Sequence, residues 1–399
     1  MSLLLWARHY RIDSFRFDLM GHQPGAAMED AQALLRRELG RDVPFIGEGW
    51  NFGEVADHRR FRQAAQGALD GTAIGTFSDR GRDALRGGAH DDRGERLVSR
   101  RGWLHGATEE ADLVRAALAG TLRDYPLPTA GGETKPLERL DYRGQRAGYA
   151  SQPGEVVNYV ENHDNQTLFD ISAYKLPTAT SKEDRARVQM LGAAINAFSQ
   201  GIAYYHAGID TLRSKSMDRN SYNSGDWFNR LDWSYADNNF GVGAPPQADN
   251  GDNWALIKPL LANAQIKPGA SEIGWTRDAF RDLLAIRASS TLFRLRTAED
   301  VKARLAFRNT GSGQVPTVLA GHLDGSGYRG ANFRELLYFV NVDKQPQTLV
   351  LDADKGKAWR LHPVHGAGAD RRPANDASYE PASGRFVIPP RSAVVYVLD

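Results

Sequence analysis

The chain has 399 residues, of which 41% are hydrophobic and 25% charged, a composition typical of a globular protein with a large core. Its 50 Lys and Arg residues balance 49 Asp and Glu, so no basic excess favours nucleic acid or an anionic membrane as a partner. The absence of cysteine excludes disulfides, thiolate metal sites and a cysteine nucleophile, and no apolar run reaches the length of a membrane span.

The first half of the chain alternates between short apolar runs and helical periodicity. Residues 2–10 have the pattern of the last turns of a helix. Strands are predicted at 11–18, 43–50, 71–79, 155–164 and 201–208, and helices at 26–40, 110–120 and 182–201. Such alternation predicts parallel strands joined by right-handed crossovers, and polar residues at the carboxyl ends of several strands are typical of a (β/α)8 barrel.

The second half begins with loops and ends with strands. Segments 89–150 and 210–274, rich in glycine, asparagine, aspartate and aromatic residues, are predicted to be long loops, and loops of this length are often functional. After a helix at 276–290, strands are predicted at 304–309, 316–324, 335–342, 347–352, 359–364 and 386–399. We therefore predict an α/β fold: part of a barrel at 1–295, then an antiparallel β-sandwich at 296–399.

The stretch RIDSFRFD places an arginine and an aspartate two residues apart in a predicted strand. Residues two apart share a face, so we expect Arg16 and Asp18 to point one way and Phe15 and Phe17 the other. Arg16 would then keep the Asp18 carboxylate ionised, which a nucleophile requires. An isolated pair of this kind is also compatible with a structural salt bridge.

Three predicted strands end in groups that suit glycoside chemistry. Asp18 ends the first, Glu48 the second, and His163 and Asp164 the strand at 155–164. On neighbouring parallel strands Asp18 and Glu48 would lie about 5 Å apart, which suits retaining hydrolysis by a nucleophile and an acid that later acts as base. His163 and Asp164 would hydrogen-bond sugar hydroxyls as the ring distorts.

Glu48 needs a different environment from Asp18, because an acid must hold its proton until it donates it. We expect its apolar neighbours Phe45 and Trp50 to favour the neutral form by excluding water.

Several segments resemble a known family. FRFDLMGH, FIGEGWNFGE and VENHDN are similar to sequence regions of the α-amylase superfamily (glycoside hydrolase family 13). GEGWNFGEV, FSDRGRDALRGG, NYVENHDNQTLFD and HAGIDTLRSKSMDRNSYNSGDWFNRLDW are similar to segments of its pullulanase and limit-dextrinase branch, which cleaves α-1,6 linkages in branched α-glucans.

The resemblance implies a role for individual residues. Asp18 would be the nucleophile, Glu48 the acid/base and Asp164 the transition-state stabiliser. The resemblance also implies substrate-binding residues, some beside the catalytic groups, some beside the leaving-group glucose and some in the 212–228 loop: Arg16, His22, Trp50, His163, Asn165, Arg213, Asn220, Tyr222 and Asp226. The expected partner is a branched α-glucan such as pullulan or a glycogen or amylopectin limit dextrin.

The chain departs from this family in one large respect. The family barrel has three earlier strands and upstream β-domains, so we expect only about strands four to eight here. The strands at 11–18 and 201–206 would then expose apolar edges, through which copies of the chain could associate.

Two other functions stay open. One is a catalytically idle fragment that binds glucan or is purely structural, and the other is α-1,4 hydrolysis or glucosyl transfer within the same superfamily.

No cofactor is required by these motifs, and no pattern suggests a catalytic metal. The acidic stretches at 90–95 and 249–253 have ligands that suit structural calcium, although such stretches are also ordinary turns. The sequence does not indicate a compartment.

Overall fold

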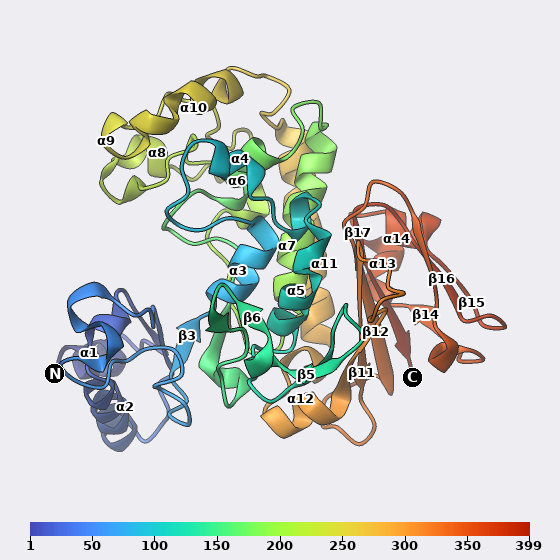
Figure 1. Cartoon of the computed structure of the whole chain (residues 1–399), viewed down its shortest axis with the longest axis horizontal. Helices are drawn as coiled ribbons and strands as arrows, with labels where there is room; N and C mark the ends of the chain where they lie inside the picture. The colour runs from blue at the N-terminus through green and yellow to red at the C-terminus, as the bar shows by residue number, and fades with distance from the viewer.

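The computed structural model describes residues 1–399 and contains two main sheets with helices between and around them (Figure 1). The first sheet has five parallel strands in the order β1-β2-β3-β8-β9. Its strands are β1 (Phe15–Phe17), β2 (Phe45–Gly47), β3 (Gly75–Phe77), β8 (Val156–Asn158) and β9 (Ile202–Ala203). All five predicted strands are present and parallel, but each is shorter than predicted. Residues are lost at the amino ends, such as 11–14 and 71–74, as well as at the carboxyl edge, where the polar residues form loops.

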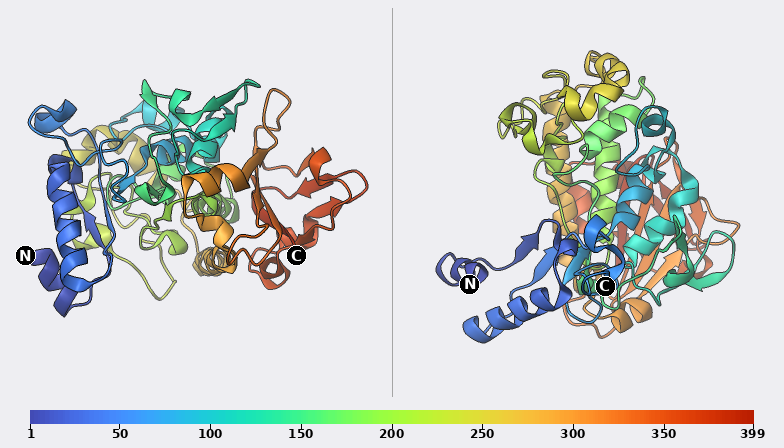
Figure 2. Two further views of the ribbon diagram at one scale, coloured as in Figure 1. Left: turned by 90° about the horizontal axis from the view of Figure 1, so that it is seen from below. Right: turned by 60° about the vertical axis from the view of Figure 1, so that its left-hand side comes forward.

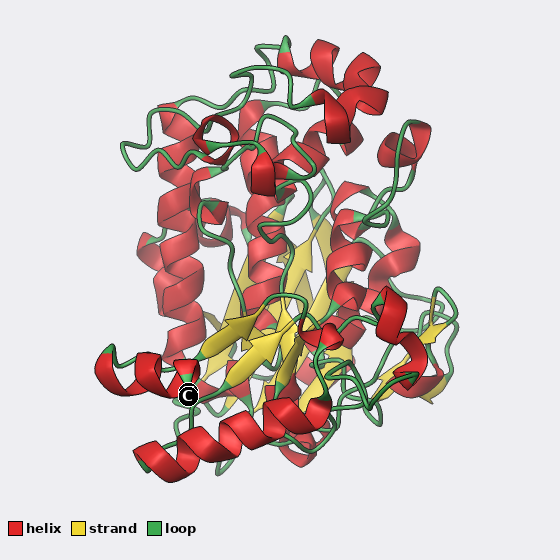
Figure 3. Ribbon diagram, turned by 90° about the vertical axis from the view of Figure 1, so that its left-hand side faces the viewer, coloured by secondary structure: helices red, strands yellow, loops and turns green.

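Helices precede, connect and follow these strands (Figure 3). They are α1 (Ser2–His9), α2 (Gly25–Leu39), α3 (Asp79–Arg86), α4 (Glu95–Ser99), α5 (Ala111–Leu118), α6 (Leu168–Lys175), α7 (Lys182–Phe198), α8 (Asp226–Asn229), α9 (Gln247–Asn250), α10 (Trp254–Leu261) and α11 (Ala270–Ser289). None of the helices combines the length and the apolar character that a membrane crossing requires.

Helix α3 lies where the sequence showed only a basic, glycine-rich stretch. It has no apolar stripe, because Arg80, Asp83 and Arg86 are themselves buried. Gly81 lets α3 approach α5, since a Cβ there would lie 2.7 Å from the Cβ of Ala117. The hydrophobic pattern therefore could not reveal this helix.

The two predicted loops contain more regular structure than expected. Besides α5, which matches the helix predicted at 110–120, segment 89–150 holds α4 and two hairpins, β4 (Pro126–Pro128) with β5 (Thr134–Pro136) and β6 (Asp141–Tyr142) with β7 (Gln145–Arg146). Segment 210–274 holds α8, α9, α10 and the start of α11, whose later part was predicted. The pieces that were not predicted are too short to show a clear period in the sequence.

The last hundred residues form two antiparallel sheets. The first, ordered β10-β11-β12-β17-β14, contains β10 (Leu305–Arg308), β11 (Val318–Asp324), β12 (Glu335–Asn341), β17 (Ser392–Leu398) and β14 (Arg360–Leu361). The second contains β13 (Gln347–Val350), β16 (Arg385–Ile388) and β15 (Ser378–Glu380). Three short helices not predicted from the sequence accompany them: α12 (Ala298–Arg304), α13 (Pro363–Ala367) and α14 (Arg372–Asp376).

Two separate apolar clusters show how these parts are held. A cluster that includes Phe339 and Phe386 draws residues from both antiparallel sheets. The largest cluster crosses from the helices into the C-terminal sheet, where Phe198 of α7 packs on Phe293 and Tyr338. The C-terminal sheet is therefore continuous with the core of the helical region.

Helices α1 and α2 stand apart from the body of the molecule, at the end opposite the C-terminal sheets (Figure 2). They have their own small core, in which Phe15 and Phe17 pack against Met20 and Phe45. The expectation that both phenylalanines share one face of the first strand is confirmed.

Gly47 lies where this small core meets the candidate site. A Cβ at Gly47 would fall 2.6 Å from the Met20 sulfur and 2.8 Å from the Phe17 carbonyl oxygen. We expect Gly47→Ala to lower the free energy of unfolding by about 1–3 kcal/mol, since overpacking must displace Met20 or the strand. Gly53→Ala is the control, because a Cβ there meets nothing within 4 Å. Equal denaturant midpoints for the two variants would contradict this account.

Candidate active site

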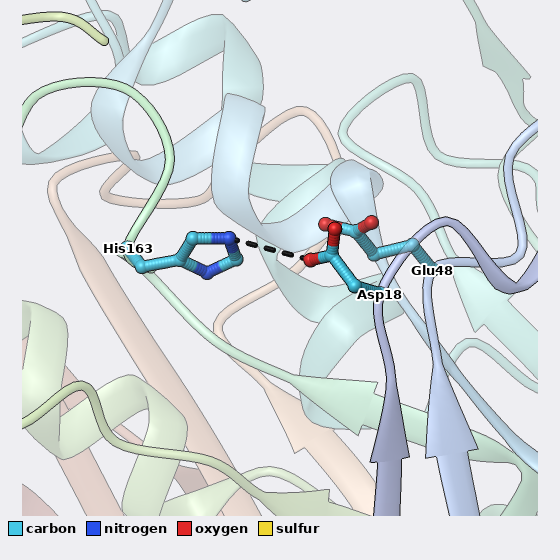
Figure 4. Close-up of side chains that lie close together, drawn as sticks. All are labelled: Asp18, Glu48 and His163. Carbon is cyan, nitrogen blue, oxygen red and sulfur yellow. Dashed lines mark ion pairs between the residues drawn. The ribbon is translucent and has the colours of Figure 1, made fainter. Parts of the chain in front are cut away.

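The ends of β1 and β2 bring two carboxylates together. Phe17 pairs with Gly47 in the parallel register, so the next residues, Asp18 and Glu48, leave neighbouring strands at the same level. Figure 4 shows both side chains with His163 approaching from the loop after β8. Carboxylate oxygens of Asp18 and Glu48 and a ring nitrogen of His163 all lie within 4.8 Å of one another.

Arg16 contacts both carboxylates. Its guanidinium donates a hydrogen bond to Asp18 and, at 2.9 Å, to Glu48 Oε1, and it lies over the Phe77 ring. Burial alone would lower the pKa of Arg16, but the hydrogen bond to Asp18 and the charges of Glu48 and Asp18 raise it. Arg16 therefore stays charged and holds the two carboxylates in place.

The environment of Glu48 differs from the expected apolar one. Phe45 packs on the opposite face of β2, in the cluster with Met20, and Glu48 accepts hydrogen bonds from Arg16 and from the Leu19 amide at 2.7 Å. Glu48 is only 5% exposed, and these donors satisfy both of its carboxylate oxygens. The expectation that Phe45 favours the neutral acid is wrong, because strand alternation turns its ring away.

Leu19 has a left-handed backbone conformation, with φ of 50°. This conformation is uncommon for a residue other than glycine and carries a small energetic cost. It turns the amide of the residue after Asp18 toward Glu48, and so ties the two carboxylate-bearing strand ends together.

The loop after β8 carries the third predicted acid. His163 Nε2 lies 3.4 Å from Asp18 Oδ1 and 3.5 Å from Asp164 Oδ1. His163 therefore contacts both aspartates for which a catalytic role is predicted. Asp164 is half exposed, and Asn165 follows it with φ of 60°.

A buried polar network behind this loop was missed by the sequence analysis. Lys215 Nζ donates to the His163 carbonyl at 2.7 Å, and His206 Nδ1 lies 3.1 Å from Glu161 Oε1. Burial lowers the pKa of Lys215 to about 8. Lys215 holds the loop by its backbone, and only His206, which stands in the apolar run GIAYYHAG, gave a sequence signal.

A cavity of about 910 Å³ opens beside Glu48, and Asp18, Arg16 and His163 are not among the residues that line it. The predicted residues Glu48, Trp50, Asp164 and Asn165 line it. A cleft of this size is large enough for an oligosaccharide segment.

Other predicted substrate-binding residues lie away from this cavity. His22 stacks on Phe52 and pairs with Glu54 at 2.9 Å. In the 212–228 loop, Arg213 is buried and donates to the backbone of Ala207 and Asn229, while the side chains of Asn220, Tyr222 and Asp226 do not line the cavity. Their role in binding substrate stays a prediction.

The predicted calcium stretches meet in the fold, where the Gly94 amide donates to Asn253 Oδ1 at 2.8 Å. Asp92 is already held by Arg100 at 2.9 Å and by the Ala89 amide, so it is a poor candidate ligand. Neither stretch brings three carboxylate or histidine groups together, and calcium binding there stays a prediction.

Comparisons with known proteins relate the chain to one family. Residues 235–399 match the family described as "Alpha-1,6-glucosidases, pullulanase-type, C-terminal". The chain is 41% identical to Pullulanase 1, chloroplastic, of Arabidopsis thaliana, over 99% of this chain and 44% of that protein. It is 37% identical to a pullulanase of Klebsiella pneumoniae, over 100% of this chain and 37% of that protein.

Solved structures agree with the sequence comparisons. The chain superposes on PulA from Klebsiella oxytoca with a TM-score of 0.92 and 36% identity, covering all of this chain and 39% of that one. It superposes equally well on the maltotriose complex of PulA from Klebsiella pneumoniae, with 38% identity and 44% of that chain covered. The chain thus spans about two-fifths of the length of these relatives. Over its whole length the chain is similar to pullulanases in sequence and in fold, and its residues 235–399 match the family of pullulanase-type α-1,6-glucosidases.

Proposed function

We propose that this chain carries the catalytic residues of an α-1,6-glucan debranching hydrolase that acts with net retention. The observation that carries the proposal is the pair of carboxylates on adjacent parallel strands, with oxygens of Asp18 and Glu48 within 4.8 Å of each other. Retaining glycosidases need a separation of about 5 Å, whereas inverting enzymes need room for a water between the carboxylates.

The proposed reaction has two steps. A carboxylate oxygen of Asp18 bonds to the anomeric carbon while that carbon loses the glycosidic oxygen, which takes a proton from Glu48. Water then attacks the anomeric carbon, gives its proton to Glu48 and releases Asp18. Asp164 and His163 would hold hydroxyls of the distorted sugar between the steps.

Arg16 and Leu19 both donate hydrogen bonds to the Glu48 carboxylate and so fix its position beside Asp18. Arg16 would remain with Asp18 and keep it ionised for attack.

The five parallel strands would be strands four to eight of a (β/α)8 barrel. The two C-terminal sheets would form a β-sandwich, and the boundary between barrel and sandwich would lie near residue 296. The parallel order, the shared carboxyl edge and the apolar cluster between the antiparallel sheets support this. Strands β1 and β9 are then open edges.

Self-association through those edges is part of the proposal. Five apolar side chains are exposed on or near the β1 edge: Leu5, Trp6, Tyr10, Ile12 and Leu19. An exposed apolar edge of this kind favours pairing between copies.

The decisive experiment is reducing-sugar release from pullulan by the purified chain, sized beforehand by sedimentation velocity so that activity is assigned to a monomer or a dimer. We expect maltotriose as the product, because cleavage of α-1,6 bonds divides pullulan into maltotriose units. Panose or isopanose would instead show α-1,4 cleavage. Binding of pullulan by the folded chain without turnover would favour the idle glucan-binding fragment.

A further inference from the structure

Arg86, at the end of α3, is a buried cation without a partner. It is 6% exposed, and its guanidinium makes no hydrogen bond or ion pair with the protein. The other arginines of α3 are satisfied: Arg80 lies between the rings of Tyr142 and Tyr149, and Arg82 donates to Asp83 at 2.7 Å. Because Arg86 also lines the large cavity, its charge faces accessible space without a carboxylate partner, and a mobile anion could reach it there.

The nearby carboxylates cannot supply a counter-charge to Arg86. Asp83 is engaged by Arg82 and by Arg143 at 2.8 Å, and Asp92 is engaged by Arg100 at 2.9 Å. Burial, followed by the charge of Arg82, lowers the pKa of Arg86 to about 10, which leaves it charged at neutral pH. Lys175 donates to the Arg86 and Gly87 carbonyls, and burial, followed by the charge of Arg86, lowers the pKa of Lys175 to about 7.

A second unpartnered polar side chain faces the same space. Gln166 is 5% exposed and its amide makes no hydrogen bond with the protein. Gln166, Asn165 and Arg86 line a recess of about 20 Å³, together with Lys175 and the paired carboxylates of Asp83 and Asp92. Arg86 also lines the large cavity beside Glu48. The recess is close to the minimum for one water-sized guest and far too small for a sugar.

We propose that Arg86 and Gln166 bind a small inorganic anion of about the size of chloride in this recess. The guanidinium would supply charge and N–H donors, and the Gln166 amide a further N–H donor. The anion would sit behind the loop that carries Asp164, and its binding does not depend on the proposed hydrolase activity.

Thermal unfolding in sodium chloride and in sodium gluconate at equal ionic strength tests this site, because gluconate is too large to enter. We expect the midpoint to rise by about 3 °C in chloride at about 100 times the dissociation constant. Arg86→Gln should abolish the difference between the salts, and Arg86→Lys should retain part of it. Arg101→Gln, which removes an exposed arginine, should behave as the unsubstituted chain.

Bromide gives a readout that does not depend on a variant. In crystals grown with bromide, we expect an anomalous peak beside the Arg86 guanidinium. Equal midpoints in the two salts, a chloride effect that survives Arg86→Gln, or no bromide peak at Arg86 would each overturn the proposal. Maltotriose could also raise the midpoint of thermal unfolding. If Arg86→Gln removed that rise, the guanidinium would bind the glucan and the anion proposal would be overturned.

Discussion

Asp18→Asn is expected to reduce reducing-sugar release from pullulan by about 10⁴-fold or more. The amide has the size of the carboxylate and keeps one oxygen to accept from Arg16, so the fold and substrate binding should persist. It lacks the charge that attacks the anomeric carbon, so the covalent intermediate cannot form. The measurement is the initial rate at saturating pullulan for both proteins, with unfolding curves to show that both are folded.

A matched control and a second substrate separate the two carboxylates. Asp13→Asn alters an exposed aspartate that pairs only with Arg41, and it should leave the rate unchanged. Glu48→Gln should lose most activity on pullulan but little on a maltosyl fluoride, whose leaving group needs no proton. Asp18→Asn should lose activity on both substrates. A nucleophile assignment to Asp18 would be wrong if its variant still cleaved the fluoride at the original rate.

The features of the site that depend on local alternation were predictable from the sequence. In RIDSFRFD, the period of two correctly separated Phe15 and Phe17 from Arg16 and Asp18, since an apolar core lies on one side of β1 only. Parallel pairing then brought Asp18 level with Glu48 without any knowledge of distances.

Contacts between distant segments were not predictable in the same way. Arg16 bonds to Glu48 as well as to its neighbour Asp18, and this second bond depends on the register of β1 against β2. The support of His163 by Lys215 joins residues 52 positions apart in sequence. Single-chain periodicity carries no information about such pairs, so the ionic environment of Glu48 emerged only from the structure.

The position of the 212–228 loop could not be derived from its own residues either. Its expected contact with substrate came from the resemblance to debranching enzymes and stays a prediction. In the structure Arg213 donates to backbone carbonyls, and such a contact depends on the surrounding chain.

The C-terminal region is expected to lose stability in mild acid because burial lowers the pKa of three of its histidines, His322, His362 and His365. His362 Nε2 lies 2.9 Å from Ser289 Oγ, and His365 Nε2 accepts from the Val395 amide at 3.0 Å. Burial, followed by the neighbouring Arg360 charge, lowers the pKa of His362 to about 4, and burial lowers that of His365 to about 3. The unfolded chain binds protons below its ordinary pKa of about 6.5, while the folded chain does not.

Stability should therefore be level above pH 6.5 and fall from there toward pH 4 and below. With about 1.4 kcal/mol per pKa unit, His362 and His365 together should remove about 3 kcal/mol between pH 6.5 and pH 5. Asp170 opposes this trend, because burial raises its pKa to about 6 and the folded form takes up that proton first.

Variants separate the contribution of the histidines to the free energy of unfolding from the opposing contribution of Asp170. Denaturant unfolding at pH 7 and pH 5 should show a smaller loss for the double variant His362→Gln, His365→Gln than for the unsubstituted chain, whatever its absolute stability at pH 7. His9→Gln, at an exposed position on α1, should leave the loss unchanged. If the double variant and the unsubstituted chain lose the same free energy between the two pH values, the histidines are not the acid-sensitive groups. If the double variant loses less free energy than the unsubstituted chain, and His9→Gln does not, the two buried imidazoles are the acid-sensitive groups. Their contacts between α11 and the C-terminal sheet then stabilise the fold only in the neutral form.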